Sequence, residues 1–115
     1  MATKLYTLDG KYIADISYNR NMPQYFTGIE HVKFSTIEIK CWYKNGFYHR
    51  EDEPAIEWSD GSKFWFKNGL RHREDGPASI SKCENKEIWY YLGFMTSTKE
   101  AHVLIKDLCK LKGLK

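Results

Sequence analysis

Residues 65–78 read WFKNGLRHREDGPA, and residues 42–55 read WYKNGFYHREDEPA. Trp42, Trp65 and Trp89 begin successive copies at intervals of 23 and 24 residues, and the third copy, which opens WYYLGFMTST, then departs from the pattern. A repeat of this length is typical of stacked supersecondary units, each too small to hold a core alone. The doubled phrase therefore predicts a repeat architecture.

An Asn-Gly pair lies between two aromatic-rich runs in each of the first two copies, at Asn45-Gly46 and at Asn68-Gly69. Asn-Gly accepts the positive φ angles of a type I′ turn and is the strongest short hairpin signal. A two-residue turn also fixes the register of its strands. We therefore expect three cross-strand pairs: Trp42 with His49, Trp65 with His72 and Trp89 with Thr96.

The flanks of the repeats complete the predicted domain. Residues 7–11, TLDGK, suggest an N-terminal hairpin, and residues 17–28 resemble an irregular loop. Residues 97–100, STKE, form a capping box that would start a helix, with Gly113 as its stop. The helix has apolar residues at helical spacing, which we expect to bury over an edge of the sheet: Ala101, Leu104, Ile105, Leu108 and Leu111.

These signals predict one mainly β domain over residues 1–115, an antiparallel β-meander of stacked hairpins capped by a C-terminal helix. Its parts are an N-terminal hairpin and loop (1–36), the hairpin repeats (37–96) and the helix (97–113). Aromatic residues make up 16% of the chain, which favours strands. We expect all these parts to form a single fold.

Charge and cysteine content argue against several classes. The net charge is +3, and residues 99–115 account for the whole excess, so no general footprint for DNA is evident. The three cysteines are far apart, without a CxxC or Cys/His spacing, and indicate reduced thiols. No signal peptide or membrane span is evident in the sequence. We expect a cytoplasmic protein that does not bind membranes.

The motif Trp-x-x-Asn-Gly-x-x-His, followed by an Asp-Gly turn and a 23-residue period, is similar to MORN repeats. It more closely resembles the WYxNGxxHRxDGPA variant found in tandem in proteins of large bacteriophages and giant viruses. The resemblance covers residues 37–100; the first copy has Glu53 where the variant has Gly, and both copies have His-Arg where MORN units have His-Gly. It implies a stack of β-hairpins with a binding or scaffold role, and supplies no activity.

The recurring charged residues look like catalytic groups, but we interpret them as structural. A catalytic constellation converges once, from different parts of a fold, whereas these residues recur at one spacing and should form a ladder. We assign as structural repeat positions His49, Arg50, His72, Arg73, Asn45, Gly46, Asn68 and Gly69. There is no nucleophile elbow, phosphate loop or metal-ligand spacing. We therefore expect no enzyme activity, no metal and no cofactor.

The tryptophans share a predicted sheet face with lysines, which leaves two interpretations open. Either Trp, His and Lys stems simply cover one another, or the face is a partly exposed aromatic and basic contact surface. The residues that would contact a partner are Trp42, Lys44, Trp65, Lys67, Arg71, Trp89 and Tyr91. A homodimer that hides the aromatic face is also left open.

The functional hypothesis is non-enzymatic protein binding. The resemblance suggests a small phage or viral accessory protein that binds or inhibits a host or viral partner, such as a defence factor, in the host cytoplasm. The alternative is binding of single-stranded nucleic acid or nucleotides, because aromatic residues beside Lys and Arg are what single strands use.

Overall fold

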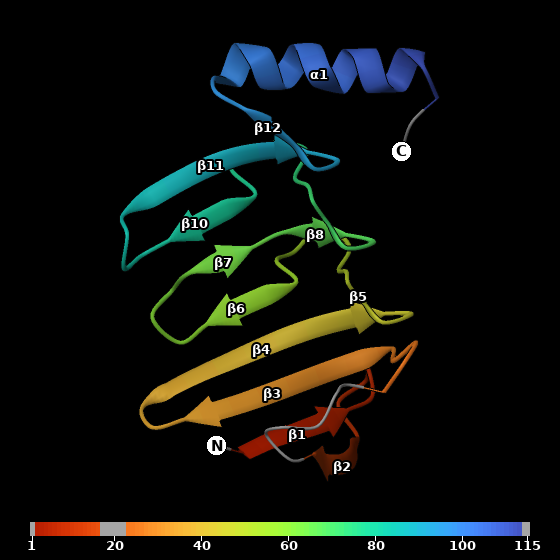
Figure 1. Ribbon diagram of the computed structural model, residues 1–115, viewed down its shortest axis with the longest axis vertical. Coiled ribbons are helices and arrows are strands. Elements are labelled where there is room, and N and C mark those ends of the chain that lie inside the picture. The colour runs from red at the N-terminus through yellow and green to blue at the C-terminus, as the bar shows by residue number, and fades with distance from the viewer. Residues whose placement is uncertain (1, 17–22, 114–115) are drawn as a thin grey trace.

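The computed structural model describes residues 2–16 and 23–113. Antiparallel strands follow one another along the long axis of the molecule, and a helix lies across one end (Figure 1). The elements are β1 (Ala2–Tyr6), β2 (Tyr12–Ile16), β3 (Gly28–Phe34), β4 (Ile37–Lys44), β5 (Phe47–Tyr48), β6 (Ile56–Trp58), β7 (Lys63–Phe64), β8 (Phe66–Lys67), β9 (Leu70–Arg71), β10 (Ser79–Ser81), β11 (Lys86–Tyr91), β12 (Phe94–Thr96) and α1 (Lys99–Leu111).

The main sheet has the order β12-β11-β10-β7-β6-β4-β3-β1-β2, and β5 pairs with β4 outside this path. From β3 to β12 the strands in the sheet pair in chain order, whereas β1 lies between β2 and β3. β8 and β9 form a separate two-stranded hairpin. The prediction of a mainly β, antiparallel meander capped by a C-terminal helix is confirmed.

The two-residue turns have the predicted geometry. Both residues of each turn have positive φ: 51° and 84° at Asn45-Gly46, 49° and 83° at Asn68-Gly69, and 45° and 84° at Leu92-Gly93. These are the signs that a type I′ turn requires. The third turn has Leu in place of Asn, a side chain that disfavours positive φ.

The register is also as predicted. The His49 N–H donates to the Trp42 carbonyl (3.0 Å), and the His72 N–H donates to the Trp65 carbonyl (3.1 Å). In the third copy Trp89 faces Thr96. The turn chemistry alone was sufficient to place these residues opposite one another, because a two-residue loop leaves no freedom to slip.

Successive turns stack on one another through the glycine N–H groups. Gly46 donates to the carbonyl of Phe26 (2.8 Å), Gly69 to that of Tyr48 (2.9 Å) and Gly93 to that of Arg71 (2.8 Å). The stack is tight, because a Cβ added to Gly69 would lie 2.9 Å from Cδ1 of Phe47. Glycine is therefore required at this position by both backbone angle and space.

The N-terminal hairpin is present and joins the main sheet. The Thr7 N–H donates to the Lys11 carbonyl (2.8 Å), and Gly10 has a φ of +93°. The predicted loop over residues 17–28 lies partly outside the described residues, since 17–22 are not among them. Residues 23–27 form no strand, and Gly28 already belongs to β3.

One sheet face carries a column of aromatic rings that links the copies. Ring centroids of Phe26 and Tyr43 are 5.8 Å apart, those of Tyr43 and Tyr48 are 5.0 Å apart, and those of Tyr48 and Phe66 are 5.2 Å apart. Tyr43 is buried and donates to Oε1 of Glu30 (2.8 Å). Burial raises the pKa of the Glu30 carboxyl, and the Tyr43 hydrogen bond partly offsets this.

Two expectations for the helix were wrong. The N-cap is Thr98, whose hydroxyl accepts from the Ala101 N–H (3.0 Å), so the helix begins one residue later than a Ser97 capping box requires. The residues buried against β11 and β12 are His102 and Cys109, and not the predicted leucines.

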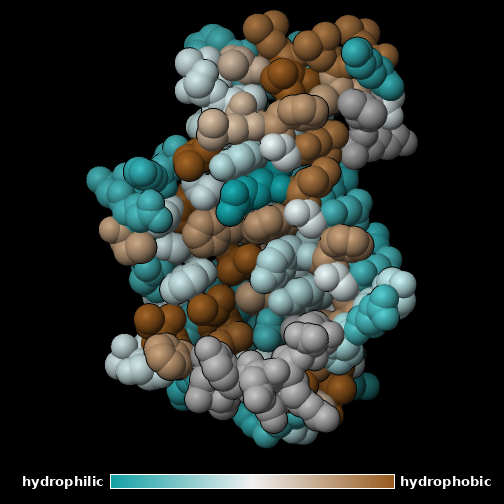
Figure 2. Space-filling view, in the orientation of Figure 1, coloured by the Kyte–Doolittle hydropathy of each residue, from teal (hydrophilic) through white to brown (hydrophobic). Residues whose placement is uncertain are grey.

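Leu104, Leu108 and Leu111 are between 52% and 84% exposed. Figure 2 shows hydrophobic residues gathered at the end of the molecule that holds α1. The predicted end of the helix is confirmed, since Gly113 has a φ of +73° and donates to the Lys110 carbonyl (3.1 Å). None of the helices within the described ranges is long and apolar enough to span a membrane.

Candidate functional site

Each of the first two tryptophans is covered by an arginine of its own copy. The Arg50 guanidinium carbon lies 3.8 Å from the Trp42 ring centroid, and that of Arg73 lies 3.8 Å from the Trp65 centroid. The guanidiniums also donate to the carbonyls of the two Pro residues that follow, Arg50 to Pro54 (3.2 Å) and Arg73 to Pro77 (3.1 Å). The loop after each His therefore turns the Arg back onto the Trp of its own copy.

The two repeat histidines connect one copy to the next. Nδ1 of His49 accepts the Asn68 N–H (2.9 Å), and Nδ1 of His72 accepts the Leu92 N–H (2.9 Å). An accepting nitrogen carries no proton, so each imidazole is neutral with its hydrogen on Nε2. Burial lowers the pKa of His72, with a smaller opposing effect from Glu74. These hydrogen bonds connect each imidazole to the turn of the next copy.

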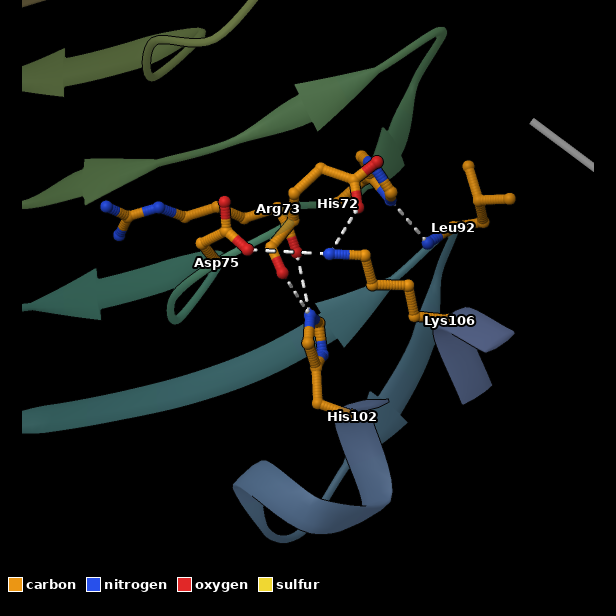
Figure 3. A network of polar contacts seen from close by, with 7 residues as sticks. His72, Arg73, Asp75, Leu92, His102 and Lys106 are labelled. Atoms are coloured by element: carbon orange, nitrogen blue, oxygen red, sulfur yellow. Dashed lines mark hydrogen bonds and ion pairs between the residues drawn. The ribbon is translucent and has the colours of Figure 1, made fainter. Parts of the chain in front are cut away.

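The third copy obtains its imidazole from the helix. Thr96 stands where His49 and His72 stand, and His102 of α1 packs edge-on against Trp89, with centroids 4.9 Å apart. His102 is 2% exposed, and its Nε2–H lies 2.9 Å from the Arg73 carbonyl oxygen (Figure 3). Its Nδ1 faces the Thr96 hydroxyl at 3.2 Å. Sequence reasoning missed this role, because His102 lies outside the repeat.

The charged loops of the two copies line one groove with a volume of about 340 Å³. Three pairs of lining residues are equivalent in the two copies, and the other four belong to the second copy alone: Arg50, Glu51, Asp52, Arg73, Glu74 and Asp75, with Trp65, Phe66, Lys67 and His72. This lining contains no Ser, Thr or Cys, and the described parts of the chain hold no cluster of three metal-ligating side chains. The groove therefore offers hydrogen-bond donors and acceptors, without a hydroxyl or thiol group.

The buried thiol of Cys41 is a poor nucleophile too. Burial raises the pKa of Cys41 to about 12, and the nearby Glu30 charge adds to this. A thiol with such a pKa holds its proton at neutral pH. The prediction that the chain is no enzyme stays a prediction.

The residues expected to contact a partner have three different environments. Trp42 and Trp65 are half-buried beneath their arginines, and Trp89 is half-buried against His102. Tyr91 is 3% exposed, which rules out its predicted partner contact: it lies between the imidazoles of His72 and His102. Lys44 and Arg71 are exposed, and the half-buried Lys67 lines the groove.

A row of exposed apolar side chains lies beside these lysines, and sequence reasoning missed it. The row, here called the turn strip, consists of Phe47, Leu70 and Phe94, which are between 48% and 57% exposed. All three directly follow the turn glycines, and Phe47 and Leu70 face Lys44 and Lys67 across their hairpins. The missed signal was an apolar residue at the same turn position in all three copies.

No protein-family model, curated protein or solved structure matches this chain.

Proposed function

We propose that the protein is a non-enzymatic protein-binding module and that the turn strip is its contact surface. The observation that carries this proposal is the exposed apolar residue after the glycine of three stacked turns. A soluble fold rarely leaves such a row open unless it serves a contact. The cations Lys44, Lys67 and Arg71 border the row, which gives it the mixed apolar and basic composition of a contact surface.

The row is continuous from one copy to the next. Phe47 lies over Gly69, and Leu70 lies over Gly93, where an added Cβ would be 3.4 Å from Cδ2 of Leu70. Two strands per copy give a spacing of about 10 Å between equivalent side chains. A partner segment with apolar residues at that spacing would contact several copies at once. The contact with the glycine of the next turn buries only part of Phe47 and of Leu70, since about half of each side chain stays exposed.

The biological setting of the proposal comes from the repeat motif. The similarity to tandem repeats of bacteriophage and giant-virus proteins favours a small viral accessory protein that occupies or inhibits a host or viral partner, such as a defence factor, in the host cytoplasm. The support for this part is the motif alone.

Binding of single-stranded nucleic acid is the second candidate. The observation that favours it is the exposure of Phe47 and Phe94 beside Lys44, Lys67 and Arg71, because bases stack on exposed rings while cations contact phosphates. The basic groups are few, so the affinity for a single strand would be low and would fall only modestly with salt.

The test is a selection of binders from a displayed random 12-residue peptide library, with the folded protein as bait. The strip variant F47S/L70S should lose enrichment that the wild type shows. The control variant Y12S/I13S removes two exposed apolar side chains of β2 at the other end of the sheet and should keep it. Equal enrichment by all three proteins would contradict the proposal. Fluorescence anisotropy of labelled dT20 at two salt concentrations tests the nucleic-acid alternative. That alternative requires the wild type to bind dT20 at low salt and F47S/L70S not to bind it.

A further inference from the structure

The charged loops of the two copies, residues 49–53 and 72–76, differ in how many of their hydrogen-bond donors have an acidic partner. In the first copy His49 and Arg50 each have a carboxylate partner. His49 Nε2 lies 2.8 Å from Glu51 Oε1, and Arg50 contacts Glu53 (3.1 Å) and Glu57 (3.5 Å). The sequence of this copy therefore shows which partner these positions take when the chain supplies one.

The second copy lacks the carboxylates that its arginine would need. Gly76 and Ile80 stand where the first copy has Glu53 and Glu57. Arg73 donates to the Pro77 carbonyl (3.1 Å) and stacks on Trp65, but it forms no ion pair within the described part of the chain. Lys67, which lines the same groove, likewise has no ion pair there.

His72 of the second copy has no hydrogen bond to a carboxylate, because Glu74 pairs with Lys106 of the helix instead. Lys106 of α1 lies 3.3 Å from Glu74 Oε2 and 3.4 Å from Asp75 Oδ1 (Figure 3). Glu74 Oε1 is consequently 3.8 Å from His72 Nε2, beyond hydrogen-bond length. The His72 side chain is only 9% exposed and its Nδ1 is occupied by the Leu92 N–H. Its Nε2–H thus has no hydrogen-bond partner in the described structure, and this nitrogen keeps access to the groove.

We propose that the groove binds carboxylate side chains from an acidic segment of the partner protein, with His72 Nε2–H, Arg73 and Lys67 as the donors. This inference rests on the proposed function, because it names the chemistry that the surface next to the turn strip selects. Carboxylate is favoured over phosphate because the first copy fills the equivalent positions with glutamates.

The acids of the groove are only partly compensated. Glu51 accepts from the neutral His49, a hydrogen bond that lowers the pKa of Glu51 but leaves its negative charge in place, and the single cation of Lys106 contacts both Glu74 and Asp75. Asp52 forms no ion pair or side-chain hydrogen bond within residues 2–16 and 23–113, so among the acids that would oppose an anionic guest it is the one without a partner. Removing its charge should strengthen binding of an acidic segment and weaken binding of a basic one.

The variants follow from these contacts. H72N keeps a side-chain oxygen near the position of Nδ1, able to accept the Leu92 N–H, and removes the Nε2–H donor. D52N removes the opposing charge without changing shape. K106M removes the cation that pairs with Glu74. Glu74 should then accept from His72 Nε2–H, as Glu51 accepts from His49, and so occupy the donor that the partner's carboxylate would use.

The probes are peptides selected from the random 12-residue library, each also made with Asp and Glu replaced by Asn and Gln. Affinities are measured by isothermal titration calorimetry. We expect acidic residues in the selected sequences. H72N should lose about tenfold in affinity, the scale of a charge-assisted hydrogen bond. K106M should lose less, and D52N should gain about threefold. The neutralised peptides should bind wild type and H72N equally.

Selected peptides without acidic residues, or equal affinity of the acidic and neutralised forms, would overturn the groove assignment. The proposed function would still stand in that case, provided that F47S/L70S abolishes their binding. If the wild type binds dT20 and H72N does not, the groove binds phosphate, and the carboxylate inference is overturned. Failure to enrich any peptide would overturn both. Circular dichroism and the Leu92 amide resonance verify that each variant is folded.

Discussion

The Arg73 guanidinium lies 3.8 Å from the centroid of the Trp65 ring and donates to the carbonyl of Pro77 at 3.1 Å. It thus joins the start of a copy to the end of its charged loop. Arg50 repeats both contacts in the preceding copy. The stacked guanidinium explains why Arg follows His in each copy, and why the tryptophans are half-buried although they share a sheet face with lysines.

Replacement of this arginine by lysine should destabilise the fold although the charge is kept. R73K loses the planar stack on Trp65 and the directed hydrogen bond to Pro77, which together should cost about 1–2 kcal/mol. Urea denaturation followed by tryptophan fluorescence measures this loss. Unfolding of R73K at the wild-type midpoint would show that the stack contributes nothing.

His72 should make stability depend on pH near neutrality. Burial lowers its folded pKa below the unfolded value of about 6.5, so the unfolded chain binds the proton more tightly. The contribution is fully present above pH 6.5 and is lost as the pH falls through the folded pKa. The melting temperature of the wild type should therefore fall more between pH 7.5 and 5.5 than that of H72N. An identical fall in both proteins would place the titration elsewhere.

Gly69 should tolerate alanine less well than Gly10 does. Both have positive φ, so both substitutions incur backbone strain, but only at Gly69 does the new Cβ meet Phe47, at 2.9 Å. We expect G69A to cost about 1 kcal/mol more than G10A, the scale of mild overpacking. The double variant F47A/G69A should recover part of this difference. Equal costs of G69A and G10A would mean that the turns are not closely stacked.

The helix cap distinguishes two adjacent residues. Thr98 accepts the Ala101 N–H, so T98A should cost about 1 kcal/mol. S97A should stay within about 0.5 kcal/mol of wild type, as an exposed residue outside the cap. Chemical denaturation of the two variants measures both values, and the reverse order would restore the capping box expected from the sequence.

Local rules predicted the hairpins well. Asn68-Gly69 determines a turn, the turn determines the register, and the register places Trp65 opposite His72 without reference to the rest of the fold. The helix position was less accessible. Its leucines form a regular apolar stripe, but the sheet end presents Trp89 and Tyr91, whose rings pack against His102. Which helical face is buried depends on that tertiary partner, and hydrophobic periodicity alone chose the wrong one.

The candidate site was harder to predict because its properties depend on differences between nearly identical copies. The spacing of His72 and Glu74 equals that of His49 and Glu51, yet only the first-copy pair is hydrogen-bonded. The cause is Lys106, which lies in a separate element and far along the chain. The exposure of Phe47 could not be predicted from the sequence either, because an apolar residue beside a turn can be buried in the fold or exposed to a partner.

The central claim is that the repeated histidines are architectural and hold successive turns together through Nδ1. Long-range ¹H–¹⁵N correlation of the imidazole nitrogens at pH 7.5 tests it most directly. We predict that His49 and His72 are neutral with the proton on Nε2, and that the Asn68 and Leu92 amides show through-hydrogen-bond coupling to Nδ1. Rings protonated on Nδ1, or amides of Asn68 and Leu92 that exchange freely with solvent, would contradict the account.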